Sequence, residues 1–284
     1  MSEPRSALAH AKINLVLEVL GVRDDGYHEI DTILQEVELA DVVAVAPASD
    51  WAIDVTGPRA AGTPEDHSNL ALRAAILLAE RVEDSCPVRI SLEKHVPAAG
   101  GLGGGASDAA TALKLLAELW PRATWPDLQA VANAIGSDEA FFLVGGTARA
   151  AGRGERVTPL PSLPAHDVVL FVPRQTVERK TPRMFAALDR HAFDGRLLAE
   201  LFQADHRQTV TMEATFNAFE RVAFDLFPWL ADLWADLERR TGEAIRLAGA
   251  GPCMFWVGPA GGERVASSAR GADCEIILTR TVTR

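Results

Sequence analysis

A run of glycines is the segment of this sequence best suited to binding phosphate. Residues 100–105 read GGLGGG, and residues 107–120 have the spacing of an amphipathic helix. Backbone with little side chain that leads into a helix can surround a phosphate with N–H groups, and the helix dipole favours the negative charge. An isolated glycine pair would be only a flexible turn. Five glycines in six positions before a helix predict a phosphate-binding loop.

Two familiar phosphate motifs do not fit this run. The P-loop requires a lysine after its last glycine, and Ala106 occupies that position. The dinucleotide fingerprint is matched loosely by Gly101, Gly103 and Ala106, but the preceding segment, residues 88–96, alternates polar and apolar residues. A buried parallel strand should be apolar throughout. A nicotinamide enzyme is therefore not expected.

A lysine and an asparagine share one face of a predicted strand over residues 11–19. Apolar residues alternate there with polar ones, so Lys12 and Asn14 project to the same side. A solvated strand lysine is the alternative interpretation. Asp138 lies at the start of a short predicted helix, and from its position alone it need only favour the positive end of the helix dipole.

The only tyrosine of the chain, Tyr27, lies in a turn with the sequence DGYH at residues 25–28. The turn carries no apolar stripe, so a core role for this ring is not expected.

The elements that must position these residues indicate an α+β protein. The sequence predicts one domain over residues 1–160 and a second, of ferredoxin-like character, over residues 161–284. Predicted strands cover residues 11–19, 30–39, 42–46, 88–96, 168–172, 245–247, 254–257 and 275–281, with a hairpin over 147–159. Predicted helices cover 68–82, capped by Ser68, 107–120, 126–135 and 137–142, capped by Ser137. Further helices begin at Thr181, with Pro182 at the first position, and end near Arg240.

Composition excludes several classes of protein. The formal charge of −11 argues against broad binding to nucleic acid, which needs a basic surface. Three widely spaced cysteines indicate neither a disulfide framework nor a zinc site. No apolar segment approaches the length of a membrane span, and the N-terminus lacks a signal-peptide pattern. We expect a cytoplasmic protein, either a monomer or a homodimer.

Residues 97–110, PAAGGLGGGASDAA, resemble the phosphate loop of the superfamily of galactokinase, homoserine kinase, mevalonate kinase and phosphomevalonate kinase. Four further segments are similar in order and spacing to the 4-diphosphocytidyl-2-C-methyl-D-erythritol kinase family: AKINL at 11–15, DGYH at 25–28, GSDEAFF at 136–142 and LAGAGPCMF at 247–255. The resemblance implies a ribosomal-S5-like N-terminal domain and a ferredoxin-like C-terminal domain. It implies ATP- and Mg²⁺-dependent phosphorylation of the 2-hydroxyl of a cytidine-diphosphate-bearing alcohol, in the non-mevalonate route to isoprenoids.

The resemblance also implies roles for the catalytic and substrate-binding residues. Asp138 would accept the hydroxyl proton, and Lys12 would keep that carboxylate ionised and stabilise the charge that develops on oxygen. Tyr27 would stack on cytosine, with His28 at the edge of the base and Phe185 on the opposite face. Phe185 could equally face the core of a helix. Asn14 would line the same substrate site.

The resemblance places a further set of residues at ATP. Its members are Asn69, Lys94, Pro97, Gly100, Gly101, Leu102, Gly103, Gly104, Gly105, Ala106 and Ser107. For three of them a local role is an alternative: Asn69 could only help to begin a helix, Lys94 could be solvated, and Ser107 could be an N-cap. Gly249 and Gly251 form either a simple turn between strands or a second small-residue loop at the substrate. The sequence identifies no metal ligand.

Three departures from the family pattern concern this site. Glu139 and Ala140 follow Asp138 where the family usually has G-x-D-V-P, so the turn there can differ. Ala248 replaces a usual serine or threonine, and its hydroxyl is absent. Asp108 replaces a frequent asparagine, and an acid beside phosphates needs compensation from Mg²⁺, the helix dipole or an outward rotamer.

Two other functions remain open on the sequence. A related kinase could act on homoserine, mevalonate or a sugar, but those substrates have no cytosine for the DGYH segment to bind. A non-catalytic nucleotide-binding regulator is the second alternative, and the presence of both Lys12 and Asp138 argues against it.

Overall fold

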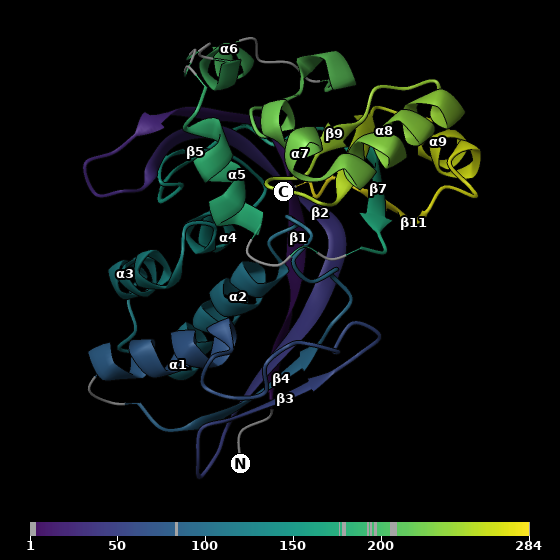
Figure 1. Ribbon diagram of the computed structural model, residues 1–284. Coiled ribbons are helices and arrows are strands. Elements are labelled where there is room, and N and C mark those ends of the chain that lie inside the picture. The colour runs from purple at the N-terminus through teal and green to yellow at the C-terminus, as the bar shows by residue number, and fades with distance from the viewer. Residues whose placement is uncertain are drawn as a thin grey trace. The chain divides into compact units, whose positions relative to one another are not determined.

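The computed structural model describes residues 4–82, 85–175, 177, 180–191, 193, 195, 198–204 and 209–283 (Figure 1). The strands are β1 (Arg5–Val22), β2 (His28–Pro47), β3 (Ala52–Thr56), β4 (Val88–Glu93), β5 (Thr147–Gly152), β6 (Arg156–Pro159), β7 (Asp167–Pro173), β8 (Phe216–Asn217), β9 (Arg246–Leu247), β10 (Met254–Gly258) and β11 (Cys274–Arg280). The helices are α1 (Leu70–Arg81), α2 (Gly104–Leu119), α3 (Trp125–Ile135), α4 (Glu139–Val144), α5 (Lys180–Leu188), α6 (Leu198–Ala204), α7 (Glu220–Leu226), α8 (Pro228–Thr241), α9 (Gly262–Ser268) and the short 3₁₀ helix η1 (Met212–Ala214). The predicted α+β class is confirmed.

Two compact units interleave along the chain. Unit 1 contains residues 1–11, 39–98 and 103–145, and unit 2 contains residues 12–38, 99–102 and 146–284. Strands β1 and β2 contribute residues to both units. The division of the chain at residue 160 stays a prediction.

Unit 1 combines a sheet with four helices. In the sheet, β4 pairs in parallel with β3 and antiparallel with the second half of β2. Buried and exposed residues alternate along β4, as the sequence predicts. Helix α1 packs against α2 and α3, and α4 packs against the same two helices (Figure 1). The apolar face predicted for α2, which includes Leu113, Leu116 and Trp120, is buried.

Unit 2 contains the predicted hairpin and a second sheet. The first half of β2 pairs with β5, and β5 pairs with β6 across the turn. The second sheet is antiparallel and has the order β11-β7-β10-β9 among the described residues. Numbered along the chain, these strands have the order 4-1-3-2, with helices between the first and second and between the third and fourth. This is the βαββαβ arrangement of a ferredoxin-like fold, as predicted.

Two predicted helix caps are wrong. Asn69, not Ser68, caps α1, because its Oδ1 accepts the N–H of Ala71 at 2.9 Å. The Ser68 hydroxyl instead donates to Asp66 at 2.6 Å. Asp138, not Ser137, is the N-cap residue of α4.

Helix α2 begins inside the glycine run, at Gly104 and not at Ser107. Its N-cap residue is Gly103, which has a φ of +76° that most residues avoid. Gly104 lies close to Val96, which follows β4 in unit 1, since a Cβ on Gly104 would be 3.1 Å from Val96 Cγ1. Ser107 is therefore an interior residue of the first helical turn, and the predicted N-cap role for it is wrong. No helix in the described parts of the chain is long and apolar enough to cross a membrane.

Candidate active site

Two small-residue loops of unit 2 contact each other. One contains Gly100, Gly101 and Leu102, and the other is the turn between β9 and β10. Gly101 has a φ of +88°, and a side chain at this position would overlap the carbonyl oxygen of Ala248. The N–H of Cys253 donates to the Gly100 oxygen at 3.1 Å. The turn is thus both a connection between strands and a second loop against the glycine run.

Lys12 lies beside these loops with its ammonium held in one direction. It is 3% exposed, and its Nζ donates to Asn14 Oδ1 at 2.7 Å. Asn14 Nδ2 in turn donates to the Thr32 hydroxyl at 2.9 Å, and that hydroxyl donates to a main-chain oxygen of β1 at 2.6 Å. A Cβ on Gly249 would be 3.2 Å from the Lys12 Nζ. The alternative of a solvated lysine is wrong, and the fixed cation can stabilise charge that develops on a nearby oxygen.

Aromatic rings gather around His28 in unit 2. The His28 ring stacks on Phe185 with a centroid distance of 4.2 Å and an interplanar angle of 20°. Its Nε2 lies 2.7 Å from Asp189 Oδ1, so Nε2 carries a proton, and in a neutral ring Nδ1 is then an acceptor. Tyr27 is 51% exposed, with the Arg153 guanidinium 4.7 Å from its ring centroid. The structure brings His28 and Phe185 together and confirms that Tyr27 is not a core residue.

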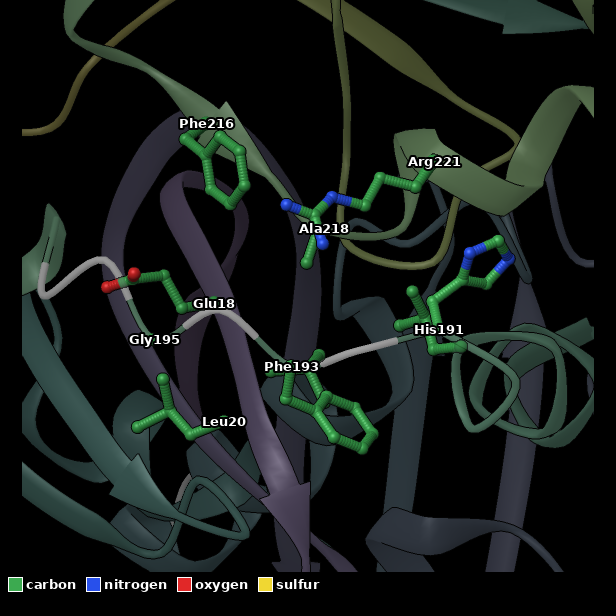
Figure 2. A pocket seen from close by; sticks show the side chains of 10 residues that line it. Glu18, Leu20, His191, Phe193, Gly195, Phe216, Ala218 and Arg221 are labelled. Carbon is green, nitrogen blue, oxygen red and sulfur yellow. The ribbon is translucent and has the colours of Figure 1, made fainter.

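A small pocket adjoins this aromatic group (Figure 2). It is lined by residues of β1, of the segment after α5, of β8 and of α7, among them Glu18, Phe193, Phe216 and Arg221. Phe193 also contacts the edge of the His28 ring, with a centroid distance of 6.4 Å. The aromatic group therefore borders a hollow on one side.

Unit 1 holds a buried ion cluster under the start of α2. The Lys94 ammonium donates to the carboxylates of both Asp41 and Asp108. The other oxygen of Asp41 accepts the N–H of Val96 at 2.8 Å. All three charged residues are at most 4% exposed. The alternative of a solvated Lys94 is wrong, while its contact with ATP stays a prediction.

Asp108 is compensated by a residue that the sequence analysis did not pair with it. Burial raises the pKa of Asp108 to about 7, and the positive charge of Lys94 opposes that shift. Burial also opposes the charge of Lys94, but the two carboxylates outweigh it and raise the pKa of the ammonium. Oδ1 of Asp108 is buried and accepts no hydrogen bond from the described residues. Lys94 therefore compensates the charge of Asp108, and the burial of Asp108 shows that the expected outward rotamer is wrong.

The other predicted ATP residues differ in exposure. Ser107 is 1% exposed and its N–H donates to the Gly103 oxygen at 2.9 Å. Pro97 and Leu102 are buried, whereas Gly105 is exposed. Asn69 has the local role of helix cap already described. The assignment of these residues to ATP stays a prediction.

Asp138 and Glu139 lie at the start of α4 in unit 1. Asp138 makes no side-chain cap hydrogen bond, so helix capping does not explain its carboxylate. Glu139 is 3% exposed and lies against Gly136, where a Cβ would be 2.7 Å from its Oε1. Burial, followed by the charge of Asp138, raises the pKa of Glu139 to about 7. The departure at this position thus places a second, buried carboxyl group beside the predicted base.

We expect Glu139→Gln to stabilise the protein at pH 8 by about 1–3 kcal/mol. Because the folded-state pKa of Glu139 is raised, the folded state binds more protons than the unfolded chain between about pH 4.5 and 7. The free energy of unfolding contributed by this group therefore falls as the pH rises through that window. Urea unfolding of both proteins at pH 5 and pH 8 measures the effect. An equal stability difference at both pH values would contradict it.

The sequence analysis missed Asp41, Asp189 and Lys180. Asp41 is an acid inside an apolar strand, which is a usable signal for a buried partner. The Lys180 ammonium donates to the carbonyl oxygens of Ala99 and Gly251, one in each of the two small-residue loops. The feature of the sequence that could have pointed to Lys180 is the rarity of lysine in this chain. Nothing in the sequence pairs Asp189 with His28, because 161 residues separate them.

Comparison with known proteins agrees with this arrangement. The GHMP kinases N terminal domain matches residues 69–146. A 4-diphosphocytidyl-2-C-methyl-D-erythritol kinase of Dehalococcoides mccartyi is 39% identical over 255 residues, which cover 87% of each chain. A protein of the same name from a Geobacillus species is 35% identical, with 87% of this chain and 86% of the relative covered.

Solved structures show the same fold. A crystal structure of a 4-(cytidine 5'-diphospho)-2C-methyl-D-erythritol kinase has a TM-score of 0.79 at 35% identity, with 99% of this chain and 100% of that chain covered. A mevalonate kinase of Methanococcus jannaschii has a TM-score of 0.66 at 12% identity, over 100% of this chain and 99% of that one, and shows the shared fold alone. The chain therefore belongs to the 4-diphosphocytidyl-2-C-methyl-D-erythritol kinase family of the GHMP kinases.

Proposed function

We propose that the protein transfers the γ-phosphoryl group of ATP to the 2-hydroxyl of 4-diphosphocytidyl-2-C-methyl-D-erythritol, a step in the non-mevalonate route to isoprenoid precursors. The observation that supports this most is the likeness, at 39% identity and over 87% of the chain, to a kinase of that name. The proposed enzyme is cytoplasmic and is a monomer or a homodimer.

The proposed roles follow from the local chemistry. The glycine run and the start of α2 bind the phosphates, because backbone N–H groups and the helix dipole both favour an anion there. Lys12 stabilises negative charge on the reacting oxygens, and Asp138 accepts the hydroxyl proton. Mg²⁺ would enter as its complex with ATP, because it commonly keeps phosphate and water oxygens and takes one or two carboxylates from the protein. Ser107 and Asp138 carry oxygen atoms of the type that would hold it.

The cytidine group distinguishes this proposal from kinases of homoserine, mevalonate or a sugar. His28 stacks on Phe185 and offers a polar ring edge, which suits recognition of a planar base. An alcohol without a base would use neither feature.

The decisive experiment measures ADP release from ATP and Mg²⁺ with a panel of four alcohols. We expect 4-diphosphocytidyl-2-C-methyl-D-erythritol alone to support rapid turnover, and homoserine, mevalonate and galactose to give background rates. Comparable turnover of mevalonate would overturn the substrate assignment. Nucleotide binding without turnover of any alcohol would favour a regulator.

We expect Tyr27→Ala to raise the KM for the cytidine-bearing substrate by a factor that corresponds to about 1–3 kcal/mol, with a smaller change in kcat. The ring is half exposed, so its loss removes a stacking surface without opening the core. Trp125→Ala is the matched control, because this aromatic residue is 47% exposed at the start of α3 and has no assigned role. An unchanged KM in Tyr27→Ala would make the ring structural.

A further inference from the structure

Lysine is rare in this chain, and most of the lysine side chains are buried. The sequence holds four lysines against 24 arginines. Lys12, Lys94 and Lys180 are 3%, 4% and 8% exposed, and only Lys114 is half-buried. The ammonium of lysine is compact and strongly hydrated, so burial of it is unfavourable unless a partner compensates. Lys12 and Lys94 already have assigned or structural roles, which leaves Lys180 to be explained.

Lys180 lies where the two small-residue loops of unit 2 meet. Its Nζ donates to the carbonyl oxygen of Ala99, which leads into the glycine run. It also donates to the carbonyl oxygen of Gly251, in the turn between β9 and β10. These loops contact each other through Gly101 and Ala248. The ammonium is therefore part of the phosphate-loop region of unit 2.

The second cation near these loops is Lys12. Its N–H donates to the Leu102 oxygen at 2.9 Å, and its Nζ lies beside Gly249. Burial lowers the pKa of Lys180 to about 8; the side chain of Cys253 opposes that shift, and the positive charge of Lys12 adds to it. Within the described parts of the chain, Lys180 forms no ion pair with an Asp or Glu. Two ammonium groups thus influence each other, and no carboxylate among the described residues pairs with Lys180.

A side chain that links two carbonyl oxygens by hydrogen bonds does not need to carry a charge. A neutral amide could donate to one of them without the unfavourable burial of an ammonium group. Two like charges in a region of low dielectric repel each other, and an anion that binds both removes the repulsion. The adjoining glycine run is itself suited to an anion.

We infer that Lys180 is a second phosphate-binding cation of this site, which acts with Lys12 on the phosphate groups of ATP. The inference rests on the proposed function for the identity of the anion, a nucleoside triphosphate. It adds to that function a binding residue on helix α5, which lies 168 positions after Lys12 in the sequence.

Three substitutions separate charge from hydrogen bonding: Lys180→Gln keeps a donor without charge, Lys180→Met removes both, and Lys180→Arg keeps the charge. Binding of a non-hydrolysable ATP analogue with Mg²⁺ is measured by calorimetry, without any acceptor alcohol. We expect the Gln and Met variants to bind about 10- to 100-fold more weakly, as for loss of a hydrogen bond to a charged group, and the Arg variant to bind within about 10-fold of the wild type. Binding by Lys180→Gln within about twofold of the wild type would overturn the inference and leave Lys180 as a tie between loops.

A pH series gives a readout that a structural tie would not change. We expect the affinity of the wild type for the analogue to fall above about pH 8, as Lys180 loses its proton, and the affinity of Lys180→Gln to be flat there. Among the described residues, the charged or titratable groups that act on Lys180 are Lys12 and Cys253. We expect the affinity of Cys253→Ala to fall above about pH 8 as that of the wild type does, and a flat profile in this variant would contradict the inference. Arg183→Gln removes an exposed charge from the same helix and should bind normally. The same pH dependence in Lys180→Gln as in the wild type would contradict the inference.

The design also separates this inference from the proposed function. If the wild type binds no ATP analogue, the kinase function and the inference both fail. If it binds the analogue but all variants bind equally well, only the role of Lys180 fails. If the preferred alcohol is another one, the binding result for Lys180 still stands. Thermal unfolding checks each variant, and the Gln and Arg pair decides the question if Lys180→Met does not fold.

Discussion

Asp138→Asn is expected to leave a folded, nucleotide-binding protein whose kcat falls roughly 10²- to 10⁴-fold, the effect of removing a positioned general base. Asparagine has nearly the same shape as aspartate, but its amide does not accept a proton from the substrate hydroxyl. Because phosphoryl transfer can pass through a loose transition state in which the base acts late, the fall can lie at the low end of that range.

The local structure makes a purely structural role for Asp138 easy to separate from a catalytic one. Its side chain makes no cap hydrogen bond at α4, and asparagine is itself favoured at the N-cap position. A structural Asp138 should therefore tolerate the change with little loss of stability. Near-native turnover by Asp138→Asn would remove the residue from the catalytic role.

Asp127→Asn provides the matched control. Asp127 lies at the start of α3, and its Oδ2 accepts from the Thr124 hydroxyl at 2.6 Å in a capping box. Loss of this charge should lower stability only slightly and leave kcat unchanged. The two variants together distinguish the loss of a helix-start carboxylate from the loss of a base.

The sequence predicted those features of the fold that depend on local patterns. The alternation over residues 88–96 appears as the alternating burial of β4. Of the two glycines predicted to bound the hairpin turn, Gly152 ends β5 and Gly154 lies in the turn before β6. The order of strands and helices after residue 167 was sufficient to predict the ferredoxin-like sheet, because few topologies satisfy a βαββαβ sequence.

Helix starts were less predictable, because neighbouring residues compete for the cap. Ser68 and Asn69 are both good cap residues, and the competition is decided by Asp66, which binds the Ser68 hydroxyl. Within the glycine run, helix propensity places the start late, at Ser107. In the structure the helix begins earlier, at Gly104, where a side chain would come within 3.1 Å of Val96, so the early start suits a glycine.

Side-chain pairs distant in sequence could not be predicted. Lys94 and Asp41 are separated by 53 residues, and Lys180 and Gly251 by 71. A local sequence pattern shows only which residue type stands at a position and which face of a helix or strand it occupies. The partner of such a residue depends on the tertiary fold, which brings distant segments together. For this reason the sequence indicated Lys12 and Asn14 together, on one strand face, and left Lys94 either at ATP, as the resemblance implies, or solvated.

Lys12→Met is expected to lower kcat at least as far as Asp138→Asn does, because it removes a fixed cation that stabilises charge in the transition state. The structure supports a fixed position, since the ammonium is buried and donates to Asn14, which Thr32 holds in turn. Lys114→Met is the control for a lysine-to-methionine change: its Nζ donates to a main-chain oxygen of α4 at 3.1 Å, and we expect a loss of stability without a comparable loss of kcat.

The double variant of Lys12 and Asp138 tests whether the two residues act on one reacting hydroxyl. Residues that act as a unit give effects that are far from additive, because the second substitution removes a group whose partner is already lost. We therefore expect kcat of Lys12→Met/Asp138→Asn to lie close to the lower of the two kcat values that the single variants show. Independent roles would instead multiply the two losses, to about 10⁵-fold or more. The measurement is kcat of all three variants at saturating ATP, with thermal unfolding of each, and a multiplicative result would show that the lysine and the aspartate serve different steps.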